Sequence, residues 1–187
     1  MNKIRCMKKA LFIISLAFAA GIASAQTFTL KSKDVGGQAT NKQVFNGFGC
    51  TGENVSPELS WENAPADTKS FAITMYDPDA PTGSGFWHWV VFNIPANTTE
   101  LKTGAGNASK GLLPAGAIQS VTDFGQPGYG GPCPPQGHGF HTYIITIYAL
   151  KTAALAGLGA TTTPALVGFN VHFNTLAKAS IVMYYQR

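Results

Sequence analysis

Histidines and aspartates beside Gly- and Pro-rich loops are the residues of this sequence best suited to chemistry. His88 lies within an aromatic and β-branched segment, and Asp77 lies where a second such segment runs into the turn D-P-D-A-P. His138 and His141 lie at the end of the loop G-Y-G-G-P-C-P-P-Q-G-H-G. Aspartate and histidine together are suited to acid–base chemistry, and the glycines of such a loop let backbone N–H groups approach a ligand closely.

Each of these residues also has a simpler interpretation. A lone histidine on a strand face, here the face that His88 would share with Phe86, Val90 and Phe92, is more often a satisfied core residue than a ligand. Aspartate and proline are common turn residues, which is a sufficient explanation for Asp79. The peptide bonds before the prolines of Ala80-Pro81 and Pro134-Pro135 are candidates for the cis form, which base rates make a minority outcome.

Catalysis and metal binding are two further alternatives. Asp77 with two histidines suits a hydrolase of an ester or phosphoester, but Ser84 lies in T-G-S-G and not in a G-x-S-x-G nucleophile elbow. His138 and His141, with His88 and Asp77, could supply metal ligands, although a loop residue and a pocket residue explain the two neighbouring histidines more simply. We therefore expect no enzymatic activity, no cofactor and no metal.

The first 25 residues have the pattern of a secretory signal peptide. A basic start precedes an apolar run over residues 10–22, and A-S-A at 23–25 fits a cleavage site near Ala25. The run is shorter than the roughly 20 apolar residues that span a bilayer. The pattern predicts a periplasmic or secreted protein whose mature part, residues 26–187, is a single domain.

Removal of this leader changes the charge and the cysteine count. The full chain has 13 Lys+Arg and 9 Asp+Glu, and the leader holds four of the basic residues and none of the acids. The mature chain is then neutral, so the basic excess does not indicate a nucleic-acid partner. Cys6 leaves with the leader, and the even pair Cys50 and Cys133 predicts one disulfide in an exported protein, with two separate buried thiols as the alternative.

The elements that must position the histidines are mostly strands. Alternating or continuously apolar segments predict strands at residues 26–31, 57–61, 70–76, 86–94, 140–150 and 180–185. Residues 44–53 and 101–139 are rich in glycine and proline and predict loops, and a loop as long as the second is usually functional.

One helix is expected late in the chain. A Thr-Pro pair at 163–164 suits a helix start, and residues 165–177 place Leu166, Phe169, Phe173 and Leu176 on one stripe. Many strands with one amphipathic helix and no repeating βαβ unit predict a mainly β fold, an antiparallel β-sandwich or barrel with a helix at its side.

Three segments, in order, resemble the phosphatidylethanolamine-binding protein family, which includes Raf kinase inhibitor proteins and flowering-time regulators. They are D-P-D-A-P at 77–81, W-H-W-V-V-F-N at 87–93 and Y-G-G-P-C-P-P-Q-G-H-G-F-H-T-Y at 129–143. The stretch G-F-G-C-T-G-E-N-V-S-P-E-L-S-W at 47–61 resembles the bacterial Raf-kinase-inhibitor-like branch, the YbhB/YbcL type. The resemblance covers residues 28–185.

The resemblance implies an antiparallel Greek-key β-sandwich with a C-terminal helix and few short helices. It also implies a small pocket for phosphate, an acetate-like anion or a phospholipid headgroup. Carried over by position, the pocket residues are Asp77, His88, His141 and Tyr143, with backbone donors around Gly131, Pro132 and Cys133. Trp87 and Pro132-Cys133 depart from the family pattern, and the second departure suggests that a disulfide to Cys50 pins the loop.

These residues suggest how the implied pocket would work. Asp77 would hold one histidine in a fixed tautomer and favour its charged form, so that imidazolium and backbone amides bind the anion together. Anion affinity should then weaken as pH rises through the histidine pKa. The resemblance allows an inhibitory or regulatory role, a protein target outside the cytoplasm and a homodimer. A pure interaction protein with a vestigial pocket is the alternative.

Overall fold

The computed structural model of the protein describes residues 26–187, and the predicted signal peptide lies outside these described residues. Within them the chain forms ten strands, one α-helix and one short 3₁₀ helix. The strands are β1 (Thr29–Lys31), β2 (Asn46–Gly47), β3 (Cys50–Thr51), β4 (Leu59–Glu62), β5 (Ser70–Asp77), β6 (Phe86–Pro95), β7 (Glu100–Leu101), β8 (Ile118–Gln119), β9 (His141–Leu150) and β10 (Thr175–Tyr185). The helices are η1 (Ala108–Lys110) and α1 (Pro164–Asn174).

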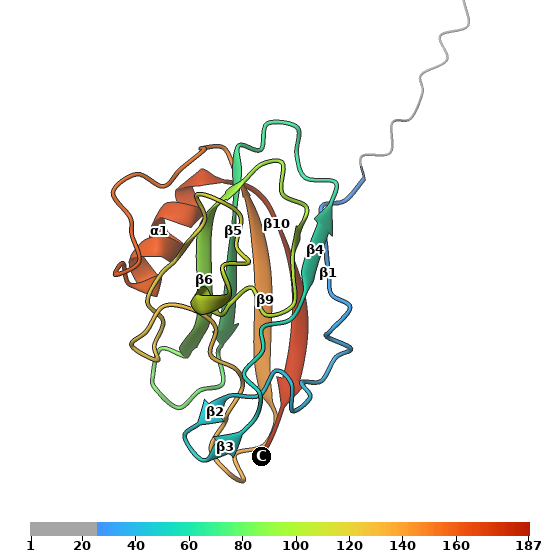
Figure 1. Ribbon diagram of the computed structural model, residues 1–187, viewed down its shortest axis with the longest axis vertical. Coiled ribbons are helices and arrows are strands. Elements are labelled where there is room, and N and C mark those ends of the chain that lie inside the picture. Colours follow the sequence, from blue (N-terminus) through green and yellow to red (C-terminus); the bar gives the residue numbers. More distant parts are fainter. Residues whose placement is uncertain (1–25) are drawn as a thin grey trace, which may run out of the picture.

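The largest sheet has the strand order β10-β9-β5-β6-β8, and all of its neighbouring strands are antiparallel (Figure 1). At its centre Ile73 of β5 pairs with Val91 of β6 and Ile147 of β9. A second antiparallel sheet has the order β1-β4-β7, and β2 and β3 form a separate hairpin. The prediction of a mainly β fold with antiparallel sheets is confirmed, while the Greek-key connection stays a prediction.

The two faces of the five-stranded sheet are covered by different partners. One face shares an apolar cluster with the three-stranded sheet, in which Trp89 and Ile147 meet Leu59 and Leu101. The other face packs against α1. Both faces of β5 are buried, which explains why its sequence is apolar without alternation.

The helix buries a different face from the one that its apolar stripe suggested. The predicted stripe, here called the α1 stripe, consists of Leu166, Phe169 and Phe173 of the helix and Leu176, which lies in β10, and its exposed fractions are 40 to 61%. The buried contacts with the sheet come from small apolar side chains of the helix, Pro164, Val167 and Val171. The apolar stripe therefore does not form the buried face of the helix, which is made by Val167 and Val171.

The ends of the predicted elements also shift. The helix ends at Asn174 and not at residue 177, because Thr175 turns directly into β10 and pairs with Leu150. β10 consequently begins five residues before the predicted strand. The predicted loop 44–53 contains the β2–β3 hairpin, and 101–139 contains η1 and β8 but is otherwise irregular.

Two further observations concern the described residues as a whole. All peptide bonds in residues 26–187 are trans, so neither cis candidate, Ala80-Pro81 or Pro134-Pro135, is realised. Among the same residues, no helix is long and apolar enough to cross a membrane.

Candidate functional site

A pocket of about 130 Å³ is lined by residues from the end of β5, the starts of β6 and β9, and the turn between β2 and β3. The β2–β3 hairpin lies at the lower end of the molecule in Figure 1. The wall of the pocket combines five polar side chains, one of them Thr82, with aromatic residues and the prolines of two loops. The four residues predicted from the sequence all line it: Asp77, His88, His141 and Tyr143. All four are at least 95% buried.

The antiparallel pairing of β5 and β9 brings three of these residues together. Asp77 is the last residue of β5 and His141 is the first of β9, so both lie at the same end of the sheet. Tyr143 is two residues further along β9 and therefore points to the same face as His141. The distance of 64 residues along the chain is closed by ordinary strand pairing.

A β-bulge places His88 in the pocket. In the pairing of β5 with β6, Met75 is opposite Trp89 while Tyr76 is opposite Trp87, so His88 is the extra residue of β6. Bulges re-aim side chains and are frequent beside functional sites. His88 therefore does not share a face with Val90 and Phe92, as simple alternation predicted. Those two residues pack toward α1.

Instead, the ring of His88 packs among aromatic residues of the pocket. Its centroid lies 5.1 Å from that of Phe86, 5.3 Å from that of Phe124 and 5.1 Å from that of Tyr143. His88 is therefore both a buried, hydrogen-bonded residue and a part of the pocket wall.

Asp77, His141 and His138 form a chain of hydrogen bonds. The Nδ1–H of His141 donates to Oδ2 of Asp77 at 2.7 Å, which fixes the orientation of the buried ring. Nε2 of His141 lies 2.7 Å from Nδ1 of His138, and one proton is shared between these two nitrogens. His138 is exposed, so the chain connects a buried carboxylate to solvent. Asp77 is thus the orienting partner of His141, and His138 occupies the other ring nitrogen.

His88 has a different partner and a different charge state. Its Nδ1 lies 2.8 Å from the carbonyl oxygen of Gly130, which can only accept, so Nδ1 carries the proton. Burial lowers the pKa of His88 from 6.5 to about 4, and the Gly130 carbonyl and the Asp77 carboxylate offset only part of this effect. The ring is therefore neutral at pH 7, and Nε2 is a hydrogen-bond acceptor. The histidine that Asp77 orients is His141 and not His88, so the predicted imidazolium beside Asp77 stays a prediction.

The hydroxyl of Tyr143 has no hydrogen-bond partner among residues 26–187, although it is completely buried. Burial, and then the nearby Asp77 carboxylate, raise the pKa of Tyr143, so the hydroxyl keeps its proton. A buried hydroxyl without a partner costs about 1–3 kcal/mol. The pocket therefore contains an unused hydrogen-bond donor.

The loop wall offers fewer backbone donors than predicted. The N–H of Gly131 donates to Oδ1 of Asn54 at 2.8 Å, and Gly131 is not among the lining residues. Its hydrogen atom would be replaced by a Cβ only 1.9 Å from the Gln43 carbonyl oxygen, so this glycine serves close backbone packing. Pro132 has no N–H. Of the three predicted donor positions, Cys133 alone both lines the pocket and keeps an N–H that is not engaged within the described chain.

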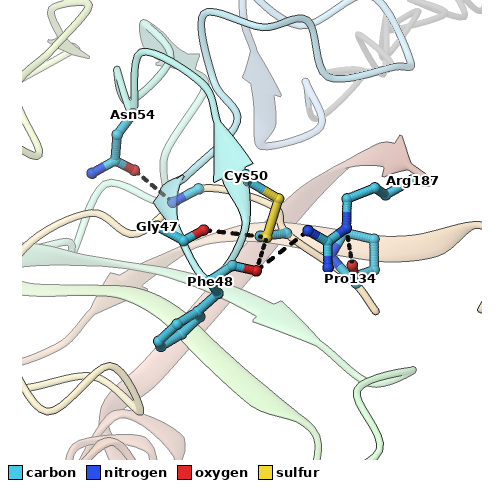
Figure 2. Close-up of a disulfide and its surroundings, with 8 residues drawn as sticks. Gly47, Phe48, Cys50, Asn54, Pro134 and Arg187 are labelled. Carbon is cyan, nitrogen blue, oxygen red and sulfur yellow. Dashed lines mark hydrogen bonds between the residues drawn. A yellow bond between two sulfur atoms is a disulfide. The ribbon is translucent and has the colours of Figure 1, made fainter. Parts of the chain in front are cut away.

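A disulfide between Cys50 and Cys133 ties this loop to the β2–β3 hairpin, with a Cα–Cα distance of 6.0 Å (Figure 2). Arg187 adds a second tie, because its Nε–H donates to the Pro134 carbonyl and its Nη1–H to the Phe48 carbonyl. Figure 2 shows the guanidinium between these two carbonyl groups. The pairing of the two cysteines that the resemblance suggested is the one in the structure.

Sequence reasoning missed the aromatic rim of the pocket. Phe48 is 70% exposed, lines the pocket and has a φ of 53°, which is unusual for a bulky residue. Its ring stacks on Phe124 with centroids 5.7 Å apart. The sequence signal was Phe48-Gly49 within a short Gly-rich stretch, since a two-residue hairpin turn of this kind requires positive φ at both positions.

No metal site is evident among residues 26–187. They contain no group of three or more His, Cys, Asp and Glu side chains placed to hold an ion. Nitrogen atoms of His138 and His141 instead face each other at hydrogen-bonding distance. These contacts do not fit the four-residue metal site that the sequence left open.

Comparison with known proteins identifies the family. The profile of the phosphatidylethanolamine-binding protein family matches residues 35–186, most of the chain. The chain belongs to the phosphatidylethanolamine-binding protein family. Within this family it is 46% identical over 182 residues to YbcL of Escherichia coli strain K12, covering 96% of this chain and 99% of YbcL.

Other members of the phosphatidylethanolamine-binding protein family support the same branch. YbhB of Escherichia coli strain K12 is 50% identical over 146 residues, which cover 78% of this chain and 90% of YbhB. The crystal structure of Escherichia coli YbcL aligns with a TM-score of 0.83, covering 86% of this chain and 98% of that structure. LppC of Mycobacterium tuberculosis, described as a putative lipoprotein, is 40% identical over 61% of this chain and 52% of LppC.

Proposed function

We propose that this protein is a binding protein that holds a small phosphate-like anion, free or as a phosphorylated headgroup, in the pocket between β5, β6 and β9. The observation that carries the proposal is the hydroxyl of Tyr143, which is buried, protonated and without a partner among the described residues. An anion oxygen that accepts from this hydroxyl would remove the cost of burying it.

The geometry around Tyr143 supports a built ligand site. His141 is fixed by Asp77, and the ring of His88 is fixed by Gly130, so the side chains facing the ligand are already oriented. The disulfide and Arg187 hold the opposite wall. A site whose groups are fixed before binding loses less conformational entropy on binding.

We propose binding and not catalysis as the role of this pocket. Three lining side chains contain a hydroxyl or sulfur: Cys133 is oxidised, Thr82 donates to the Gly85 carbonyl, and the Tyr143 hydroxyl keeps its proton because burial raises its pKa. An activated nucleophile needs a base within hydrogen-bonding reach, and none of the three is paired with one among the described residues.

We also propose that the protein acts outside the cytoplasm. The leader pattern of residues 1–25, the disulfide and the similarity to a putative lipoprotein support export. A pocket used in this compartment would meet exported or environmental anions and headgroups, and a protein target there would make the protein an inhibitory or regulatory module.

The proposal is tested by titrating inorganic phosphate into ¹⁵N-labelled protein and following the side-chain resonances of the histidines. We expect saturable shifts at His88 and His141, and an affinity about tenfold lower for Tyr143→Phe, because one charge-assisted hydrogen bond is lost. Tyr184→Phe is the control, since Tyr184 lies on β10 away from the pocket. The absence of saturable shifts would refute the proposal. Equal phosphate affinities of the wild-type, Tyr143→Phe and Tyr184→Phe proteins would also refute it. Hydrolysis of a phosphoester that requires His141 would favour the enzyme alternative.

A further inference from the structure

His88 lines the pocket, and among residues 26–187 its ring makes a hydrogen bond through Nδ1 alone, which leaves Nε2 for a ligand. The Gly130 carbonyl takes the proton on Nδ1, at 2.8 Å, and the backbone reinforces this contact because the Gly130 N–H donates to the His88 carbonyl at 2.9 Å. Two hydrogen bonds therefore join Gly130 to His88, and the one to Nδ1 fixes the tautomer of the ring. A neutral ring in that tautomer leaves a lone pair on Nε2. A ligand atom opposite Nε2 must bring its own hydrogen.

The loop wall does not supply the hydrogen-bond donors that a fully deprotonated anion would need. Among residues 130–135, three positions are prolines, which have no N–H. The N–H groups of Gly130 and Gly131 donate to the His88 carbonyl and to Asn54. Cys133 remains as the one uncommitted backbone donor of this segment. Anion sites that bind unprotonated oxyanions use several such groups together.

The charges around the pocket also disfavour a ligand with two negative charges. No Lys or Arg is among the residues that line it. Three titratable groups face His88: Asp77 from β5, Asp123 from the loop after β8 and Tyr143 from β9. Two of these three are carboxyl groups. A second negative charge on the ligand would be repelled by Asp77, which lies in the wall itself.

We propose, on the basis of the function proposed above, that the pocket selects a phosphate group that carries an acidic P–OH, as in a phosphomonoester or inorganic phosphate in its monoanionic form. The P–OH donates to Nε2 of His88, and another phosphate oxygen accepts from the Tyr143 hydroxyl. Both side chains line this one small pocket, and their ring centroids are 5.1 Å apart. A phosphodiester lacks the hydroxyl and can bind well only if His88 itself takes up a proton, which its buried setting opposes.

Methyl phosphate and dimethyl phosphate separate these cases, because they are similar in size and only the first has a P–OH. Both are titrated into the protein at pH 5.5, 6.5 and 7.5 with NMR detection. We expect methyl phosphate to bind at least tenfold more tightly than dimethyl phosphate at pH 5.5. Its affinity should fall roughly 20-fold by pH 7.5, following the monoanion population of a group whose second pKa is about 6.

The variant His88→Asn tests the role of Nε2 directly. Its amide can still donate to the Gly130 carbonyl, but it presents no acceptor at the Nε2 position. We expect the preference for methyl phosphate over dimethyl phosphate to shrink to less than threefold, while His172→Asn on α1 keeps it, since His172 does not line the pocket.

The outcomes distinguish this inference from the function on which it rests. Equal binding of the two phosphates, or binding that strengthens toward pH 7.5, would overturn the selection of P–OH while leaving an anion pocket. Binding of neither would overturn both. In the wild-type protein, the ¹⁵N resonances of His88 should show one protonated and one unprotonated ring nitrogen before ligand is added, and two protonated nitrogens would also contradict the inference.

Discussion

The pocket end of the five-stranded sheet and the outer face of α1 reverse the usual distribution of polar and apolar side chains. At the pocket, Asp77, His88 and His141 are buried, and each has a specific hydrogen-bond partner. On and just after α1, the four large apolar residues of the α1 stripe are exposed, three of them on the helix and Leu176 at the start of β10. Burial of a polar group requires a partner, whereas exposure of an apolar one requires only that smaller residues complete the packing. The pocket, and not the exposed α1 stripe, is therefore the region whose side chains indicate a functional site.

Removal of the disulfide at the pocket end should lower the free energy of unfolding more than any change on the outer face of α1. The disulfide spans 83 residues of the chain, and closing a loop of that length stabilises the folded state by about 4 kcal/mol in the chain-entropy model. The double variant Cys50→Ala, Cys133→Ala should lose about this amount of unfolding free energy in urea denaturation. Reductant should destabilise the wild-type protein to a similar degree and leave the variant unchanged. A loss below about 1 kcal/mol would show that the loop is held by other contacts.

His88 should make the pocket end sensitive to acid. Its pKa of about 4 in the folded protein is below the unfolded value of 6.5, so the unfolded chain binds the proton first as pH falls. The stability that depends on neutral His88 is therefore complete above pH 6.5 and is lost as pH falls toward 4, by about 3 kcal/mol.

Urea denaturation at pH 7, 5.5 and 4.5 measures this loss by difference. His88→Asn should lose less stability than the wild-type protein over the same range. His172→Asn, on the outer face of α1, should follow the wild-type curve. Parallel curves for wild type and His88→Asn would mean that His88 is not the buried neutral histidine described above.

In α1, mutation of a small buried residue should destabilise the protein more than mutation of a large residue of the α1 stripe. Val167 is completely buried against the sheet, so Val167→Ala should cost about 2 kcal/mol through lost apolar burial and a residual cavity. Phe169 is 61% exposed, so Phe169→Ala should change the unfolding free energy by less than about 0.5 kcal/mol. Thermal or urea unfolding of the two variants checks the order. A larger loss for Phe169→Ala would show that the α1 stripe is covered.

The strands and the pocket side chains could be predicted because they depend on short-range signals. Apolar segments such as β5 and β9 are recognisable from composition, and Asp77, His88, His141 and Tyr143 lie in segments that resemble a known family. The pairing of β5 with β9, which brings Asp77 and His141 together, is a finding of the structure and was not predicted.

What could not be predicted depends on local irregularity and on packing. The bulge at His88 changes which face the side chain occupies, and alternation along β6 carries no sign of it. The engagement of the Gly131 N–H by Asn54 depends on a contact 77 residues away. Similarly, Val167 and Val171 are the buried residues of the helix and Phe169 and Phe173 are exposed, and the periodicity of the helix sequence does not distinguish these two faces.

The most direct test of the central claim is a crystal structure of the protein grown with methyl phosphate near pH 5.5. The account predicts a phosphate group in the pocket, with one oxygen about 2.7 Å from the Tyr143 hydroxyl and another within about 3.1 Å of Nε2 of His88. It also predicts that Nδ1 of His88 remains bonded to the Gly130 carbonyl. A pocket holding only water at saturating methyl phosphate, or a phosphate bound elsewhere while the Tyr143 hydroxyl has no ligand contact, would contradict it.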